Sequence, residues 1–238
     1  MAAELATLEF DALRATLNQR LWALNQLFLD EVPFAAHLTD SVSLDPGYYI
    51  RHRIETIKRI RMTARTDALA LAAMIVEDYE SARCWARYAC EELDHDRMFY
   101  DDLAQHGLTR AVIDAQPPLA ATIALGRFLE DEIGRSGSLA AVAYSVFVEW
   151  NSERFSRTSV EKARSTYGDD YVRGSSAHLL VDESENHSSE MIALAGRLSR
   201  AQGGEQRLLR FVDEVAQLFR DYFAELSNYR GRSTVLAA

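Results

Sequence analysis

The middle of the chain offers a carboxylate and an imidazole at a spacing that suits a metal ion. In "EELDHDRMF", Glu92 and His95 are three residues apart, which places both side chains on one face of a helix. Helical bundles present two ligands to a di-iron site through this Glu-x-x-His pattern. Because the pattern also arises by chance on charged, solvated helices, a metal site requires further ligands from other elements.

A third candidate ligand is Glu149, which interrupts the apolar segment "LAAVAYSVFVEW". This segment is apolar on almost every side and is therefore expected to form a buried helix. A buried carboxylate is costly unless it is protonated, paired or bound to a cation. Two roles are open for Glu149: a metal ligand, or the partner of an arginine where the buried part of the helix ends.

The segment "AHLLVDESENHSSEM", residues 177–191, is dense in acids and histidines. At about 100° per residue, His178, Asp182 and Glu185 fall on one narrow face of a regular helix. His187 falls on the opposite face. It can join the other three only if the helix contains a π-bulge or a break, irregularities that occur at functional sites.

One more acid is expected from "RHRIETIKRI", where Glu55 is the candidate. Arginines four residues before and after it could instead hold Glu55 in salt bridges, and Glu77 and Glu80 are alternative ligands. One or two arginines of this segment could bind a substrate carboxylate, while the rest are expected on a charge-paired outer face: Arg51, Arg53, Arg59 and Arg61. The remaining histidines are expected in solvent: His37, His52 and His106.

The elements that must position these residues are predicted to be helices. Helical periodicity runs through nearly the whole chain and alternating β-branched runs are absent, so the prediction is an all-α bundle of seven or eight helices. A first helix is expected over about 4–31, and a second begins with Asp45 as N-cap and Pro46 at its first position. Single helices are expected over 80–105 and about 169–201. The length of 238 residues predicts one domain, 1–238.

Charge and composition narrow the function. A formal net charge of −10 argues against a nucleic-acid partner. No apolar run approaches the ~20 residues that span a bilayer, so no membrane association is expected. The start "MAAELATLEF" carries acids where an export signal carries basic residues. Cys84 and Cys90 lie on different turns of one expected helix, so they are expected to stay reduced, as in a cytoplasmic protein.

Taken together, these positions resemble the haem-oxygenase-like di-iron oxidases and oxygenases. The resemblance implies that two iron ions are held by Glu55, Glu92, His95, Glu149, His178 and Asp182. The last histidine of the family pattern falls on Glu185, and the nearest histidine, His187, lies two residues later. Either residue could therefore be the seventh ligand.

The resemblance also implies the chemistry. We expect an O₂-dependent oxidase of specialised metabolism whose substrate is an amino acid or an amino-acid-derived carboxylic acid. The reaction would be C–C cleavage or decarboxylation, desaturation or N-oxygenation, through a peroxide bound by the two irons. O₂ is the co-substrate, an external reductant is possible, and a homodimer is expected.

Two alternatives remain open. A thiaminase-like hydrolase of the same fold would use a cysteine nucleophile, for which Cys84 and Cys90 are available. A non-catalytic acidic helical protein would bind a partner through solvated charges, but it would gain nothing from a buried Glu149. A haem-degrading enzyme is disfavoured because residues 4–31 contain no histidine to serve as axial ligand.

Overall fold

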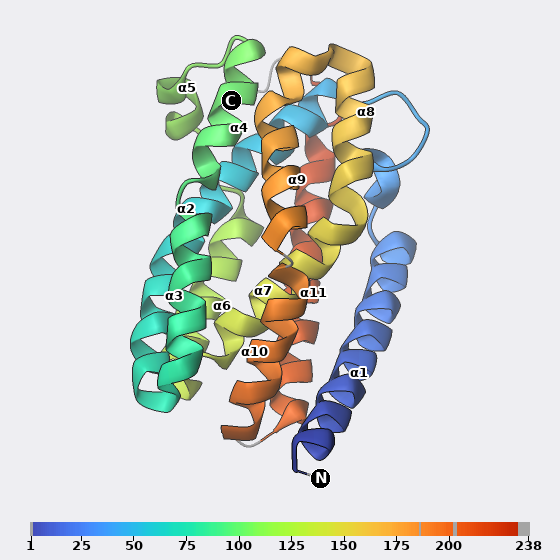
Figure 1. Ribbon diagram of the computed structural model, residues 1–238. Helices are drawn as coiled ribbons and strands as arrows, with labels where there is room; N and C mark the ends of the chain where they lie inside the picture. The colour runs from blue at the N-terminus through green and yellow to red at the C-terminus, as the bar shows by residue number, and fades with distance from the viewer. Residues whose placement is uncertain (1, 186, 202–203, 233–238) are drawn as a thin grey trace.

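A computed structural model of the chain describes residues 2–185, 187–201 and 204–232, and the side chains of residues 10–180, 187–200 and 204–232. Within these ranges the chain is almost wholly helical and has no strand, which confirms the all-α prediction (Figure 1). The helices are α1 (Ala2–Glu31), α2 (Pro46–Glu77), α3 (Tyr79–Glu92), α4 (His95–Gln105), α5 (Arg110–Ala115), α6 (Ala120–Ser136), α7 (Leu139–Asn151), α8 (Arg157–Tyr167), α9 (Arg173–Glu185), α10 (His187–Ala201) and α11 (Glu205–Leu226).

Several expected helices are divided, so the described residues form more helices than the seven or eight predicted. The helix expected over 80–105 is interrupted between Glu92 and His95. The helix expected over 169–201 starts with a short 3-10 turn, and its described parts are α9 up to Glu185 and α10 from His187. A π-helical turn, Ser152–Ser156, joins α7 to α8. These interruptions lie next to candidate ligands and change which helix face each one occupies.

The longest helix, α2, begins as the sequence predicts. Asp45 is its N-cap, its carboxylate accepts a hydrogen bond from the backbone N–H of Tyr48 at 3.0 Å, and Pro46 occupies the first helical position. The 32 residues of α2 span roughly 48 Å. This helix therefore runs the length of the bundle and can contribute side chains to several of its layers.

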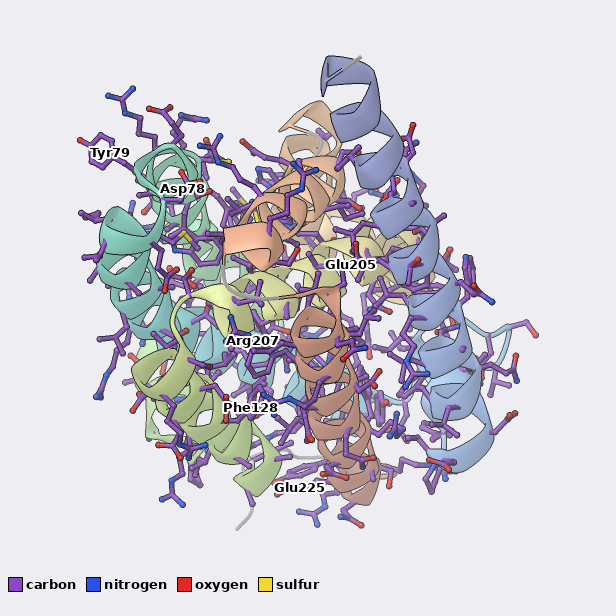
Figure 2. All side chains as sticks on the ribbon, turned by 90° about the horizontal axis from the view of Figure 1, so that it is seen from below. Asp78, Tyr79, Phe128, Glu205, Arg207 and Glu225 are labelled. Atoms are coloured by element: carbon purple, nitrogen blue, oxygen red, sulfur yellow. The ribbon has the colours of Figure 1, made fainter. Side chains whose placement is uncertain are left out.

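The hydrophobic core consists of two clusters. One surrounds α7, whose Val142, Val146 and Trp150 are buried against α10, α11 and α1. The other surrounds the first turns of α2, where Tyr48 and Ile54 pack with residues of α4, α6 and α11. In the view from below, Phe128 of α6 points toward α11 (Figure 2), where its ring centroid lies 6.3 Å from that of Phe211.

Helix α1 runs along one side of the bundle (Figure 1) and packs on α10 and α11. Its Leu13, Leu17 and Leu21 are buried, and Asn18 accepts a hydrogen bond from the indole N–H of Trp150 at 2.9 Å. Among the described residues, no helix is both long and apolar enough to cross a membrane.

Candidate metal centre

Glu92, Glu149 and His187 converge from α3, α7 and α10. Each offers a ligand atom, and these atoms all lie within 4.8 Å of one another. Glu149 and His187 are buried, and Glu92 is half-buried. His187 Nδ1 lies 4.0 Å from Glu149 Oε2. Two carboxylates and an imidazole at this distance form a donor set that suits iron, manganese or zinc.

Two further histidines lie near Glu92: His95 contacts it, and His178 packs beside His95. His95 Nδ1 is 3.1 Å from Glu92 Oε2, and the ring centroids of His95 and His178 are 4.3 Å apart. This contact brings together α4 and α9, which run side by side in Figure 1. Glu92 thus belongs to both groups, and a carboxylate has two oxygens with which it can serve two ions.

The two C-terminal histidines lie on α9 (His178) and α10 (His187). His187 is the first residue of α10, and its ring packs edge-to-face on Tyr88 at 5.3 Å. His178 lies beside His95, and His187 lies with Glu92 and Glu149, so both C-terminal histidines are near Glu92 or its partner His95. Asp182 and Glu185 lie on α9, but their side chains are outside the described residues.

The structure supports Glu149 with a hydrogen bond. The Tyr88 hydroxyl donates to Glu149 Oε1 at 2.7 Å. Burial, and then the charges of Glu149 and Glu92, raise the pKa of Tyr88 well above its usual value, so this hydroxyl stays protonated and remains a donor. Such a contact fixes the orientation of a ligating carboxylate.

Glu55 does not lie with these ligands. Its fully buried carboxylate pairs with Arg51 and accepts hydrogen bonds from the Thr122 hydroxyl and from the backbone N–H of Leu119 at 3.2 Å. Glu55 therefore holds the N-terminus of α6, as the salt-bridge alternative anticipated in part. Of the two alternatives, Glu77 has a similar role at Ser138, before α7, and Glu80 is exposed beside Arg83.

Asp67 is the α2 acid that the sequence reasoning missed. It is buried further along α2 than Glu55, and it lines the same cavity as Glu92 and Glu149. Burial, and then the charge of Glu92, raise the pKa of Asp67 to about 8. A cation at the centre would offset both effects and favour the carboxylate. The signal was present in "TDALALAAM", a lone acid next to an apolar run, like Glu149.

A cavity of about 370 Å³ opens beside the candidate centre. Asp67, Glu92, Glu149 and His178 contribute to its wall. Much of the remaining wall is apolar and includes side chains of α1, α7 and α11: Leu21, Leu24, Phe28, Phe147, Phe219 and Phe223.

The three histidines expected in solvent are partly or wholly inside the protein instead: His106 packs among tyrosines, and His52 and His37 lie deeper. His52 lines the cavity, where burial, and then Arg53 and Arg59, hold its pKa well below the usual value and keep it neutral. His37 is buried and accepts a hydrogen bond from the backbone N–H of Asp45 at 2.7 Å. His52 lies on α2 and His37 in a short 3-10 turn. In both cases only the packing shows that the side chain faces the interior.

Comparison with known proteins defines the fold. No protein-family model and no curated protein matches the chain. A crystal structure of a domain of unknown function with a haem-oxygenase-like fold, from Shewanella denitrificans OS217, has a TM-score of 0.76 and 18% identity, covering 90% of this chain and 91% of the other. A TenA homolog from Pseudomonas syringae pv. tomato DC3000 has a TM-score of 0.70 and 14% identity, covering 91% of this chain and 93% of the other. The chain therefore has the haem-oxygenase-like fold.

Proposed function

We propose that this protein is an O₂-dependent non-haem di-iron oxidase that acts on a small organic acid. The observation that carries the proposal is the position of Glu92, whose carboxylate lies 3.1 Å from His95 and offers an oxygen within 4.8 Å of ligand atoms of Glu149 and His187. All of these groups are at or next to the wall of one cavity. When bound, two ferrous ions would supply electrons for the reduction of O₂.

The residues of the chain fit such a pair of ions by charge and by atom type. The carboxylates of Asp67, Glu92 and Glu149 would balance most of the charge of two divalent cations, and His95, His178 and His187 would provide imidazole nitrogens. Asp182 and Glu185 remain candidates on α9. Asp67 would lose its proton when the metal binds, because ligands must be deprotonated.

The cavity supports a small-molecule substrate. Its volume of about 370 Å³ falls in the range of ligand pockets, and its wall combines apolar side chains with a few polar groups. The walls of α1, α7 and α11 would exclude water from the substrate during reaction. Electrons beyond those of the substrate would come from an external reductant.

A thiaminase-like hydrolase is the second candidate, because the comparisons show only a fold that both functions share. The thiol chemistry favours it less. Cys84 is half-buried, and burial together with its hydrogen bond to Glu190 raises its pKa to about 12, whereas the thiolate is the nucleophile. Neither Cys84 nor Cys90 is among the described residues that line the cavity.

Anaerobic titration with Fe(II) tests the proposal. We expect two irons per chain for the wild type, and one or none for His178→Ala and for His187→Ala. His106→Ala is the matched control, since His106 packs among tyrosines away from the centre and its loss should leave both irons bound. A wild-type chain that binds no iron would overturn the proposal.

A cysteine double variant distinguishes the di-iron oxidase from the thiaminase-like hydrolase. Cys84→Ala with Cys90→Ala should keep both iron uptake and O₂ consumption. Loss of a thiamine-hydrolysing activity in this variant, with wild-type activity independent of iron, would instead support the hydrolase.

A further inference from the structure

The structure sorts the five arginines of α2 into two kinds, and Arg65 is one of those paired with a carboxylate, that of Glu130 at 3.3 Å. Arg51 pairs with the buried Glu55, and Arg61 contacts Asp96 at 2.9 Å and Asp114 at 2.8 Å. Two others have no carboxylate within ion-pair distance among the described residues, yet both line the cavity: Arg53 and Arg59.

Arg59 has an unsatisfied donor. Its guanidinium packs on the rings of Tyr222 and Phe219, with 4.5 Å and 5.6 Å from Cζ to the ring centroids. Nη2 donates to the Thr56 hydroxyl at 3.3 Å, but Nη1 is buried and has no hydrogen-bond acceptor among the described residues. A buried cationic N–H without an acceptor is costly, which indicates that an acceptor arrives from outside the chain.

Arg59 stays charged in this position. Burial lowers its pKa, but Tyr222 and Tyr144 outweigh this effect and the pKa is raised overall. Glu55, one turn earlier on α2, is already engaged with Arg51 and with the start of α6. The charge of Glu55 also raises the pKa of Arg59, but no carboxylate among the described residues lies within ion-pair distance of Arg59.

The candidate metal centre lies at a distance from this charge. Arg59 precedes Asp67 by eight residues, which is about 12 Å along the axis of α2. Ile60 and Thr63 line the cavity between them. The acidic side chains among the described lining residues are all candidate ligands: Asp67, Glu92 and Glu149.

We propose that Arg59 binds the carboxylate of an extended, largely apolar carboxylic acid, whose body lies along the cavity toward the candidate metal centre. Nothing acidic in the described wall near Arg59 would receive an α-ammonium group, so the geometry favours a simple acid over the amino acid that the sequence suggested. The inference deepens the proposed function and rests on it only for the place where the substrate reacts. Binding of the acid is a property of the metal-free protein.

The experiment is calorimetric titration of the metal-free protein with hexanoate, octanoate, decanoate and dodecanoate, and with the uncharged decan-1-ol and methyl decanoate. We expect affinity for the carboxylates to rise roughly threefold to fourfold per methylene until the cavity is full. Decanoate should bind at least about tenfold more tightly than either uncharged analogue, since the anion satisfies a buried charged donor. This comparison requires no variant.

Variants assign the effect to one side chain. Arg59→Gln should weaken decanoate binding about tenfold or more and leave decan-1-ol binding unchanged, and Arg59→Lys should give an intermediate loss. Arg61→Gln, on the same helix but paired outside the cavity, is the control and should bind decanoate like the wild type.

Equal affinity for decanoate and decan-1-ol, or an unchanged affinity in Arg59→Gln, would overturn the proposal. So would a loss in Arg53→Gln without one in Arg59→Gln. Iron uptake is measured separately: decanoate binding without iron uptake would count against the oxidase alone, and iron uptake without selective decanoate binding would count against the Arg59 anchor alone.

Discussion

Glu92 is the side chain that contacts both parts of the candidate metal centre. It is the last residue of α3, three residues before His95, and one of its carboxylate oxygens lies within 4.8 Å of ligand atoms of Glu149 and His187. A terminal ligand touches one ion, whereas a shared carboxylate holds two. Losing a terminal ligand and losing a shared carboxylate should therefore change the number of bound irons by different amounts.

Glu92→Gln should abolish the binding of both irons, because an amide offers a single neutral oxygen where two anionic ones are shared. Glu80→Gln, an exposed acid on the same helix, is the matched control and should retain two. Metal analysis after anaerobic loading and desalting distinguishes the two outcomes. Retention of one iron in Glu92→Gln would mean that Glu92 is a terminal ligand.

Asp67 should make the stability of the metal-free protein depend on pH. Its pKa is raised to about 8 in the folded protein, so the folded state holds a proton that the unfolded state releases above about pH 4. This contribution is complete below pH 4 and is lost as the pH rises through 8. In Asp67→Asn, the Tm should fall less between pH 5 and pH 8 than in the wild type.

Thermal unfolding with a chelator present, across that pH range, measures the difference. Asp101→Asn, an exposed acid on α4, is the control and should follow the wild type. An identical pH dependence in Asp67→Asn and the wild type would show that Asp67 is already ionised at neutral pH.

At the scale of elements, α9 is the helix whose placement matters most for His178. The carboxylate of Asp102, on α4, accepts hydrogen bonds from the backbone N–H groups of Gly174 and Ser175 at 2.7 Å and 2.8 Å. An anion at a helix N-terminus stabilises the exposed donors there. Gly174 also lies so close to α4 that a Cβ would be 1.9 Å from the Met98 carbonyl oxygen.

Gly174→Ala should therefore push α9 away from α4. We expect a loss of about 1–3 kcal/mol in the free energy of unfolding, together with weakened iron binding through His178. Gly134→Ala is the control, because a Cβ on that helical glycine meets nothing within 4 Å and should be neutral or slightly stabilising. Urea unfolding and iron titration give the two readouts, and equal iron binding in both variants would contradict the positioning role.

Glu55 differs from Gly174: its replacement should lower the stability of the fold without changing iron binding. Glu55→Gln leaves the buried Arg51 without its counter-charge, which should cost about 3–5 kcal/mol in the free energy of unfolding. Iron stoichiometry should remain that of the wild type. The double variant Arg51→Met with Glu55→Leu should lose less stability than Glu55→Gln, since it leaves no unpaired charge. Loss of iron in a folded Glu55→Gln protein would restore Glu55 as a ligand.

At the scale of the whole molecule, the candidate ligands come from helices that are far apart in the sequence: α2, α3, α4, α7, α9 and α10. An ion bound by all of them links both hydrophobic clusters of the bundle. Metal binding should therefore stabilise the entire fold and not only one helix pair. Homodimerisation and a single folding unit stay predictions that light scattering and unfolding curves can check.

Fe(II) added without oxygen should raise the Tm of the wild type. At a free concentration of 100 times the Kd, the stabilisation is about 2.7 kcal/mol if the ions bind only the folded state. The increase should be much smaller in His187→Ala. Differential scanning fluorimetry under anaerobic conditions measures the shift, and an equal shift in both proteins would exclude His187 from the centre.

The sequence by itself determined the features that depend on near neighbours in the chain. Helical periodicity fixed the all-α class, and the three-residue spacing of Glu92 and His95 brought them within 3.1 Å even though the helix breaks between them. The isolation of Glu149 in an apolar segment predicted its burial, because a helix that is apolar on all sides has no solvent face.

Only the tertiary structure decided the features that depend on which face of a helix meets which neighbour. Glu55 and Asp67 are both acids of α2. The start of α6 packs beside Glu55 and engages its carboxylate, whereas Asp67 lies in the wall of the cavity. His187 is buried with Glu92 and Glu149, although a regular helix would place it opposite His178. The same packing left Arg59 without a carboxylate partner among the described residues. Arg59 is four residues from Glu55 on α2, as is Arg51, but only Arg51 pairs with it. Helical periodicity gives the direction of each side chain about its own helix axis. Which side chains meet depends instead on where the neighbouring helices lie.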